Sequence, residues 1–536
     1  MRRTWGTRLV LGLGLLCGVA TGSALWAFCP GGGPGGGGSI TTVGSSWKSW
    51  WDANRELYFV IARQKMKEAE AGSGTQVVAE DGARKKAIAA LKKAFSDANS
   101  NVRQQSVVAL GKVAGPEEAP ELRRLMEKDS EQDVRDLALL ALGLVGDKGS
   151  ADLLEKTLLD KERHEVSRSY AALALGFLGE NPAGMLGVLT KEDEALGVRL
   201  AVAMALGDIR DPKAIEALGL ILKNRKGKDL LRAMSAYSLG RQEGSEAAAK
   251  ALVQAFSLKK DDAEVTQAIA LALGNLRGDA VVQALREGAE NKKDAVTRGF
   301  TLLSLGRQQD PKQTPFMIQR LEKEQYDVRA FAALALGLQG DAKGVPALFM
   351  YLDHYGKDPS FFAAGALALG LLGDAGLAEK LVPKLKEWSH DLGFMPYAMS
   401  AAGLSGDEKA AKPLLGVYEE QAQDLTTRQI GTIALLKLGV EAPMEILPKD
   451  VQDGKVDARR ASALALGETA HGDAVDVLIK QLAEGPDDVV RANAAAALGN
   501  LLDRTLEHGT MRRLSFSYNY LLTSRNRVLW HIFQIR

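Results

Sequence analysis

The sequence predicts an all-α fold, an α-solenoid in which about thirteen helical hairpins stack side by side. Three observations predict it. One motif recurs along most of the 536-residue chain, its copies are almost evenly spaced, and small residues stand at fixed places in each copy. In such repeats each hairpin buries its apolar face against its neighbours. A continuous repeat therefore predicts one elongated body rather than several separate domains.

The motif is clearest in EQDVRDLALLALGLVGD, residues 131–147. It joins a Val-Arg pair, an Ala/Leu run, a Leu-Gly pair and a Gly-Asp turn, and HEVSRSYAALALG and PDDVVRANAAAALG repeat it. Aligned on the glycine of the Leu-Gly pair, the copies are evenly spaced except for one longer and one shorter step, on either side of Gly439. These repeat glycines are Gly111, Gly143, Gly176, Gly207, Gly240, Gly274, Gly306, Gly337, Gly370, Gly403, Gly439, Gly467 and Gly499.

Each unit is expected to hold two helices. The Ala/Leu run forms one, and a segment with longer apolar spacing, such as SADLLEKTLLD, forms a second that follows it. Ala or Ser stands two residues before the repeat glycine in twelve of the thirteen copies, which lets a neighbouring helix approach closely. We expect the repeat glycine itself to adopt the left-handed conformation that ends a helix.

The motif resembles the HEAT-like repeats of the phycobilisome-lyase type, V-R-x-x-A-A-x-A-L-G-x-x-G-D, over roughly residues 85 to 508. The resemblance implies an armadillo-like superhelix with a curved inner surface. It does not imply one function, because the same repeats serve scaffolds, adaptors and a few enzymes. Hairpins stacked about 10 Å apart would form an arc on the order of 120 Å long.

The N-terminal residues predict export. We interpret residues 1–29 as a signal peptide or an N-terminal membrane anchor, because Arg2, Arg3 and Arg8 flank the start of the apolar run LVLGLGLLCGVATGSALWAF. GSA at 22–24 suits cleavage, whereas the length of the run would also suit an uncleaved anchor. Residues 30–45 read as a Gly-rich linker. We expect a periplasmic or cell-envelope protein, tethered to the inner membrane if residues 1–29 remain.

Residues 46–82 are interpreted as an aromatic N-terminal capping helix and loop. Trp47, Trp50, Trp51, Asn54 and Tyr58 share one helix face, an arrangement that resembles the opening segment of some secreted bacterial HEAT-repeat proteins. A solenoid needs such a cap over its first repeat. The alternative is a partner-binding patch. The repeat solenoid spans residues 83–508, and residues 509–536 form a basic C-terminal tail or cap.

An arginine stands eight residues before the repeat glycine in nine units. We interpret this arginine ladder as structural, each guanidinium pairing with an Asp or a carbonyl of the adjacent unit. The alternative is a basic row for acidic ligands. The ladder consists of Arg103, Arg135, Arg168, Arg199, Arg232, Arg298, Arg329, Arg459 and Arg491, and its exceptions are Thr266, Phe362, Met395 and Gly431.

Eight aromatic residues gather near two of those exceptions, within residues 349–397. Aromatic side chains are favoured anchors of protein interfaces. We predict that these residues bind a protein partner; the alternative is that they fill a local change in curvature. The candidates are Phe349, Tyr351, Tyr355, Phe361, Phe362, Trp388, Phe394 and Tyr397.

Composition narrows the function. With 68 basic and 67 acidic residues, the chain lacks the positive charge that nucleic-acid binding needs. HEAT-repeat hydroxylases hold iron with several His-Glu pairs, but this chain has one, His164-Glu165, and we expect His164 to be merely exposed before a helix. No catalytic residue, cofactor or metal ligand is predicted. The sequence favours a non-enzymatic scaffold that binds a protein or an extended polymer on its concave surface. The alternative is a lyase-like or accessory enzyme that handles a tetrapyrrole, or a metal-dependent hydroxylase.

Overall fold

The computed structural model describes residues 46–48, 50–52, 54–55, 81–258, 261–391, 393–421, 423–469 and 471–503. The predicted signal peptide or anchor, the Gly-rich linker, Tyr58 and the basic tail lie outside these residues. The elements in the described part are α-helices and short 3₁₀ turns, which confirms the all-α solenoid. None of the described helices is both long enough and apolar enough to cross a lipid bilayer.

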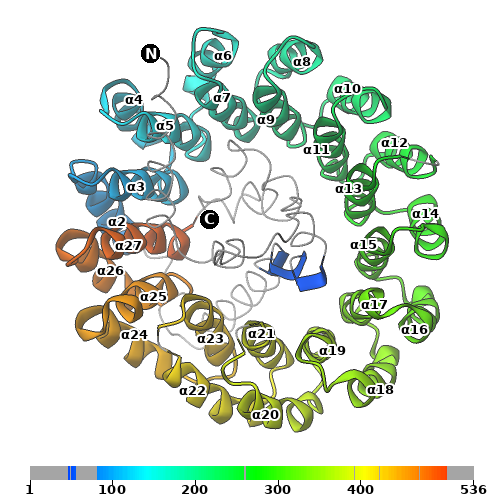
Figure 1. Ribbon diagram of the computed structural model, residues 1–536. Helices are drawn as coiled ribbons and strands as arrows, with labels where there is room; N and C mark the ends of the chain where they lie inside the picture. The colour runs from blue at the N-terminus through cyan, green and yellow to red at the C-terminus, as the bar shows by residue number, and fades with distance from the viewer. Residues whose placement is uncertain are drawn as a thin grey trace, which may run out of the picture.

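The helices alternate between an outer and an inner layer (Figure 1). The outer layer holds α2 (Asp81–Ala94), α4 (Ala119–Lys128), α6 (Ala151–Leu159), α8 (Pro182–Thr190), α10 (Pro212–Lys223), α12 (Glu246–Phe256), α14 (Asp279–Asn291), α16 (Thr314–Lys323), α18 (Val345–Tyr355), α20 (Leu377–Glu387), α22 (Ala411–Glu420), α24 (Ala442–Asp453) and α26 (Asp473–Glu484). The inner layer holds α3 (Ser100–Val113), α5 (Gln132–Leu144), α7 (Glu165–Leu178), α9 (Leu196–Leu206), α11 (Asp229–Gly240), α13 (Ala263–Leu273), α15 (Ala295–Gly306), α17 (Tyr326–Gln339), α19 (Pro359–Leu372), α21 (Met395–Ser405), α23 (Leu425–Lys437), α25 (Val456–Leu466) and α27 (Asp488–Leu501).

Each hairpin consists of an outer helix and the inner helix that follows it, so residues 81–503 form thirteen hairpins. The helix that carries the motif is the inner one. The expected order within a unit was therefore reversed, because the amphipathic helix packs on the motif helix after it rather than on the one before it. Inner helices also pack on the inner helices of both neighbouring units, and this explains why they are buried almost along their whole length.

The repeat glycine has a different role from the one expected. It belongs to the inner helix or directly follows it, and in several units a left-handed residue stands three positions later, as at Gly146 with φ 77° and Gly179 with φ 69°. A Cβ on Gly143 would lie 2.6 Å from Cα of Ala174, and one on Gly176 would lie 2.8 Å from Cα of Ala205. The glycine is needed because the backbone of the next inner helix leaves no room for a side chain.

One unit was placed in the wrong register. Gly439 has φ 76°, so it is the left-handed glycine of its turn. The alanine that faces Gly403 is Ala434, whose Cα lies 2.7 Å from the position of a Cβ. Counting two residues on from this alanine puts Leu436 in the place of the repeat glycine. The longer and the shorter step late in the chain then become regular, and the ladder position is Arg428 rather than Gly431.

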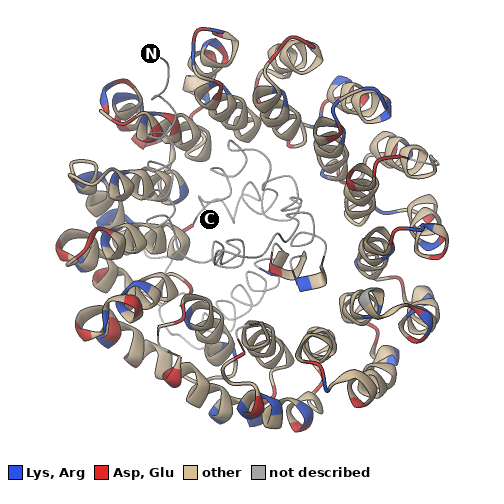
Figure 2. Ribbon diagram, viewed as in Figure 1, with Lys and Arg blue, Asp and Glu red and all other residues tan. Residues whose placement is uncertain are grey.

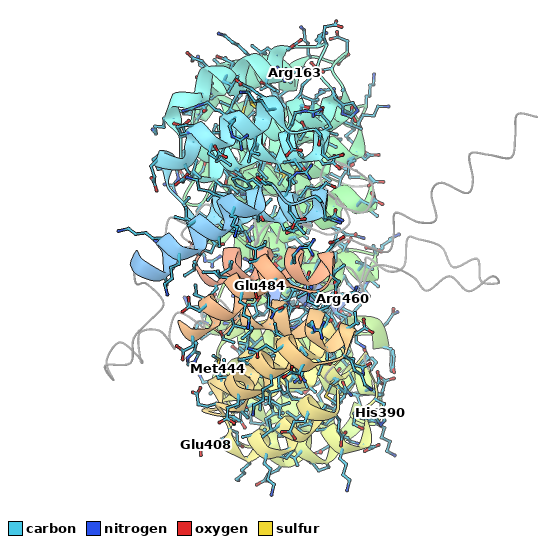
Figure 3. All side chains as sticks on the ribbon, turned by 90° about the vertical axis from the view of Figure 1, so that its left-hand side faces the viewer. Arg163, His390, Glu408, Met444, Arg460 and Glu484 are labelled. Atoms are coloured by element: carbon cyan, nitrogen blue, oxygen red, sulfur yellow. The ribbon has the colours of Figure 1, made fainter. Side chains whose placement is uncertain are left out.

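The solenoid closes into a ring, where the sequence predicted an arc (Figure 1). The last inner helix, α27, packs on the first one, α3, and α26 packs on α2. Figure 3, which faces this junction, shows the two ends side by side. A Cβ on Gly499 would lie 2.9 Å from Cα of Ala109, which repeats the contact made between consecutive units. A turn of about 28° per hairpin is enough for thirteen units to complete a circle.

Candidate binding site in the central opening

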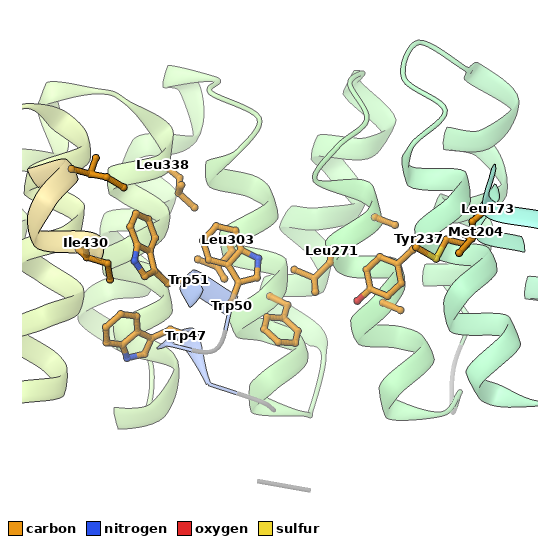
Figure 4. Packing of buried hydrophobic residues seen from close by; sticks show 14 of the residues in the cluster. Trp47, Trp50, Trp51, Leu173, Met204, Tyr237, Leu271, Leu303, Leu338 and Ile430 are labelled. Atoms are coloured by element: carbon orange, nitrogen blue, oxygen red, sulfur yellow. The ribbon is translucent and has the colours of Figure 1, made fainter. Parts of the chain in front are cut away.

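The inner helices form the wall of the ring, and they carry a row of buried apolar residues. Figure 4 shows Leu173, Met204, Tyr237, Leu271 and Leu303 in a row across successive inner helices, each three residues before its repeat glycine. Large apolar residues occupy this position in eleven units, and all of them are buried: Val108, Leu140, Leu173, Met204, Tyr237, Leu271, Leu303, Leu334, Leu367, Ile433 and Leu464. Charged residues gather instead on the outer layer and the loops (Figure 2).

A helical piece of the N-terminus lies inside the ring (Figure 1). We call it the N-terminal segment, residues 46–55, of which 49 and 53 are not described. Trp47, Trp50 and Trp51 are buried in one apolar cluster with the wall residues. The ring of Trp47 meets that of Tyr397 on α21 edge-on, with centroids 5.2 Å apart and planes at 61°.

Polar contacts fix the segment against α21. Nζ of Lys48 donates to the carbonyl of Gly393 at 2.8 Å, and the hydroxyl of Tyr397 donates to Oδ2 of Asp52 at 3.0 Å. Arg55 donates to the other oxygen of Asp52 at 3.1 Å. The Lys48–Gly393 and Asp52–Tyr397 contacts each join residues 345 positions apart in the sequence.

These contacts correct the predicted cap. The N-terminal segment packs in the opening against the tenth hairpin, and the open side of the first hairpin is covered by α26 and α27. A closed ring has no first repeat in need of a cap, so the aromatic face of the segment is used elsewhere.

The charges of the segment sit in an unfavourable environment. Burial raises the pKa of Asp52, although Arg55, Tyr397 and Lys48 oppose this shift. Burial lowers the pKa of Lys48, despite the nearby Asp391, Asp358 and Asp52. The pKa of Tyr397 is raised by burial and by its position against Asp52. Desolvation of Asp52 and Lys48 therefore weakens a contact that the tryptophans stabilise.

The arginine ladder is structural, and several of its members reach a residue 26 positions ahead, in the loop before the next inner helix. Arg103 holds both carboxylate oxygens of Asp129 at 2.9 and 3.0 Å. Arg168 holds those of Glu194, both at 2.8 Å. Other members donate to main-chain oxygens, as Arg199 does to Leu189 at 3.0 Å. Arg428, which the misplaced register hid, pairs with Asp450 at 2.6 Å.

The same pairing closes the ring. Arg491 on α27 donates to Asp97, before α3, at 3.0 and 3.3 Å. Asp97 stands in its unit where Asp129 stands in the next. Lys112 donates to Asn500 at 2.8 Å across the same junction, and both follow a repeat glycine. The two ends of the chain therefore join through the interface that already links consecutive units.

The predicted aromatic stretch takes part in this ladder. Phe362 replaces a ladder arginine. Its ring meets the ring of Trp388, 26 positions later, edge-on with centroids 5.8 Å apart. Phe394 completes the cluster at 6.0 Å from Phe362 and 4.9 Å from Trp388. Arg329 stacks on the ring of Tyr355, which stands at that offset too, at 4.5 Å. In these units, aromatic contacts join neighbouring hairpins at the position where ion pairs join them elsewhere in the ring.

The remaining candidates are also packed. The rings of Tyr351, Tyr355 and Phe361 lie 5.4 to 6.1 Å apart. Phe349 is half-buried and stays outside the two ring clusters named above. Tyr397 alone among the eight is seen to hold another part of the molecule, the N-terminal segment. Sequence reasoning singled out both aromatic regions but had no signal that they would meet. Binding of a separate partner by the eight residues stays a prediction.

Comparison with known families decides the class of protein. A family model of HEAT repeats matches residues 75–143, 220–306 and 314–393. The chain therefore contains HEAT repeats in these three ranges. A model of the HEAT-like repeat of the phycobilisome lyases matches residues 198–224, which confirms the resemblance seen in the motif. A search of the curated proteins found no match.

Several solved structures match the chain at low identity and with low TM-scores. A phycocyanin lyase complex from Nostoc is 20% identical, with a TM-score of 0.32, over 53% of this chain and 92% of that one. Human deoxyhypusine hydroxylase is 18% identical, with a TM-score of 0.22, over 48% and 96%. The karyopherin Kap121p, bound to the C-terminus of a protein phosphatase, is 13% identical, with a TM-score of 0.34, over 78% and 57%. These likenesses concern the fold alone.

The one His-Glu pair of this HEAT-repeat chain has a structural role. His164 is exposed and caps α7, its Nδ1 accepting a hydrogen bond from the backbone N–H of Val166 at 3.3 Å. Asp262 caps α13 and Asp487 caps α27 in a similar way, each through its side chain. Across the described residues, no group of three or more His, Cys, Asp or Glu is arranged to hold a metal ion.

Proposed function

We propose that this HEAT-repeat ring is a non-enzymatic binding protein that is exported to the cell envelope and holds a protein partner in its central opening. The observation that carries the proposal is the apolar row on the inner helices with a helical segment seated against it. Buried apolar residues with a few polar contacts beside them suit an amphipathic helix better than a charged polymer.

The distribution of charge supports the same occupant. Lysines, arginines and acids cover the outer layer, while the wall carries leucines, methionine and tyrosine (Figures 2 and 4). Such an opening would favour a partner through burial of apolar surface, and the outer charges would keep the ring itself in solution. The apolar run within residues 1–29 supports export.

Site-directed photocrosslinking in native envelopes tests the proposal. Phe177 is half-buried and takes in α7 the place that Leu338, drawn in Figure 4, takes in α17. Leu220 on the outer helix α10 is 65% exposed and provides the control. A photoreactive residue at position 177 is expected to capture one specific protein, and one at position 220 is not.

Equal capture from both positions would contradict the proposal, because it would place the partner on no particular face. So would a bound pigment with visible absorption, or one equivalent of iron in the purified protein, since either would favour the enzymatic alternative. Fractionation of the full chain tests export separately, and recovery of the protein in the cytosolic fraction would refute it.

A further inference from the structure

The site on α21 lies where the repeats depart from their own pattern. Phe362 on α19 and Met395 on α21 stand at ladder positions of adjacent units, and neither can donate the hydrogen bonds that an arginine makes there. Phe362 is explained by its contacts with Trp388 and Phe394. Tyr397, one turn away from these rings, turns to the opening and meets the N-terminal segment.

The contacts of the segment define what this site recognises. It takes an aromatic ring against Tyr397, a carboxylate at the Tyr397 hydroxyl, and a basic side chain at the Gly393 carbonyl. Asp391 and Asp358 lie near Lys48 and favour a positive charge there. The Lys48 Nζ also lies 5.4 Å from the centre of the Tyr397 ring. A helix with this set of side chains is therefore the matching ligand.

We propose that the N-terminal segment is a tethered, releasable occupant of the α21 site, and that a partner helix with an aromatic face, a carboxylate and a lysine replaces it. This inference deepens the proposed function and rests on it. Residues 56–80 join the segment to α2, so release leaves it attached to the ring. Partial burial of Asp52 and Lys48 offsets some of the stabilisation that their hydrogen bonds provide, which suits an occupant that must leave.

Tethering determines what a binding experiment will show. A segment that stays attached to the ring presents itself at an effective concentration on the order of 1 mM. A free peptide of the same sequence at micromolar concentration cannot compete with it. The site becomes available to such a peptide only when the contacts of the built-in segment are removed.

The test uses the full chain and a fluorescent peptide with the sequence of residues 44–57, GSSWKSWWDANREL. Fluorescence anisotropy measures its binding to the wild type and to the double variant Trp47→Ala, Asp52→Ala. We expect the double variant to bind the peptide at least about tenfold more tightly than the wild type. Lys48→Ala, which keeps the tryptophans, serves as a second variant, and we expect a smaller gain of the same sign.

Tyr397→Phe, added to the double variant, tests the contact itself. It removes the hydroxyl that meets Asp52, so we expect about fivefold weaker binding of the peptide. The loss should vanish for a peptide carrying Asp52→Ala, since the two changes remove the same hydrogen bond. Tyr418→Phe, the same chemical change on the outer helix α22, is the matched control and should leave peptide binding unaltered.

Equal peptide binding by the wild type and both variants would overturn the inference. So would a loss on Tyr397→Phe no larger than that on Tyr418→Phe. Either result, with crosslinking from position 177 still observed, would remove only the role of the segment and leave the proposed function standing. Loss of crosslinking as well would remove both.

Discussion

At the scale of single residues, the repeat glycine sets how closely successive inner helices pack. At most of these positions a Cβ would meet main-chain atoms of the next helix, as at Gly143, Gly176 and Gly306, rather than a side chain that can turn away. The need for small residues was visible in the sequence, because Ala or Ser recurs two positions before the glycine. The sequence did not show why the glycine itself is needed. A glycine at the end of a helix suggests a left-handed turn. Only the structure shows that the left-handed residue is a later one, such as Gly146, and that the repeat glycine is needed for close packing.

Replacing Gly143 by Ala should lower the free energy of unfolding by about 1 to 3 kcal/mol, because the added methyl overlaps the backbone of Ala174. Gly187 is the control: it is exposed in α8, with no atom within 4 Å of an added Cβ. There, Gly→Ala should stabilise the helix by about 0.5 to 1 kcal/mol. Urea unfolding followed by circular dichroism measures both. Equal effects would show that helix propensity, not close packing, governs the position.

The carboxyl of Asp52 should make docking of the N-terminal segment depend on pH. Its pKa is raised in the docked state, so docking favours the protonated form. Docking is therefore tightest below the ordinary value of 3.8 and weakens as pH rises through the raised pKa. The pKa of Lys48 is lowered in the docked state, so docking favours its neutral form. Its contribution to docking is lost as pH falls from 10.5 through the lowered pKa, which is the opposite direction to that of Asp52.

Acrylamide quenching of tryptophan fluorescence measures this release across the pH range. The wild type should become more quenchable as pH rises, while Asp52→Asn, which cannot ionise, should keep one level throughout. A pH dependence that survives in Asp52→Asn would assign the effect to another group.

At the scale of elements, the ladder shows that one geometric position can be held by different chemistry. Several ladder residues contact the residue 26 positions later in the sequence. The contact is an arginine with a carboxylate in some units, and an arginine or a phenylalanine with an aromatic ring in others. The sequence predicted the pairing of units through arginine, because the residue recurs at a regular place in the repeat. It could not predict that Phe362 and Trp388 replace an ion pair, since their link appears only when the partner loop is known. The alignment on glycine also failed at Leu436, where the glycine is missing.

The buried pair of Arg168 and Glu194 should contribute far more to stability than an exposed pair. Both side chains are nearly inaccessible, with 6% and 5% exposed. Glu194→Gln leaves the guanidinium buried without its counter-charge, so we expect a loss of about 3 kcal/mol. Asp160→Asn breaks the exposed pair with Arg163 and should cost less than about 1 kcal/mol. Thermal unfolding compares the two variants, and equal losses would show that burial of the pair does not matter.

At the scale of the whole molecule, closure changes what a solenoid can do. An open arc exposes its apolar ends and can bend, whereas a ring pairs both ends and encloses its inner surface. The number of units was predicted from the sequence, but closure was not. Closure depends on a small rotation per hairpin, which residue spacing does not record. Asp97 and Arg491 look like any other ladder residues in the sequence, and only the three-dimensional arrangement shows that they pair with each other.

The junction between α27 and α3 can be broken without touching the hairpins themselves. Gly499→Leu places a side chain where an added Cβ already lies 2.9 Å from Cα of Ala109, so the two ends cannot meet. The internal interfaces remain intact, because each hairpin still packs on its sequence neighbours. We expect an opened, longer particle with a larger radius of gyration in small-angle scattering and unchanged helix content. Gly416→Leu is the control, since nothing lies within 4 Å of a Cβ at that exposed position. An unchanged radius in Gly499→Leu would mean that the inner wall and its occupant hold the ring shut without this contact.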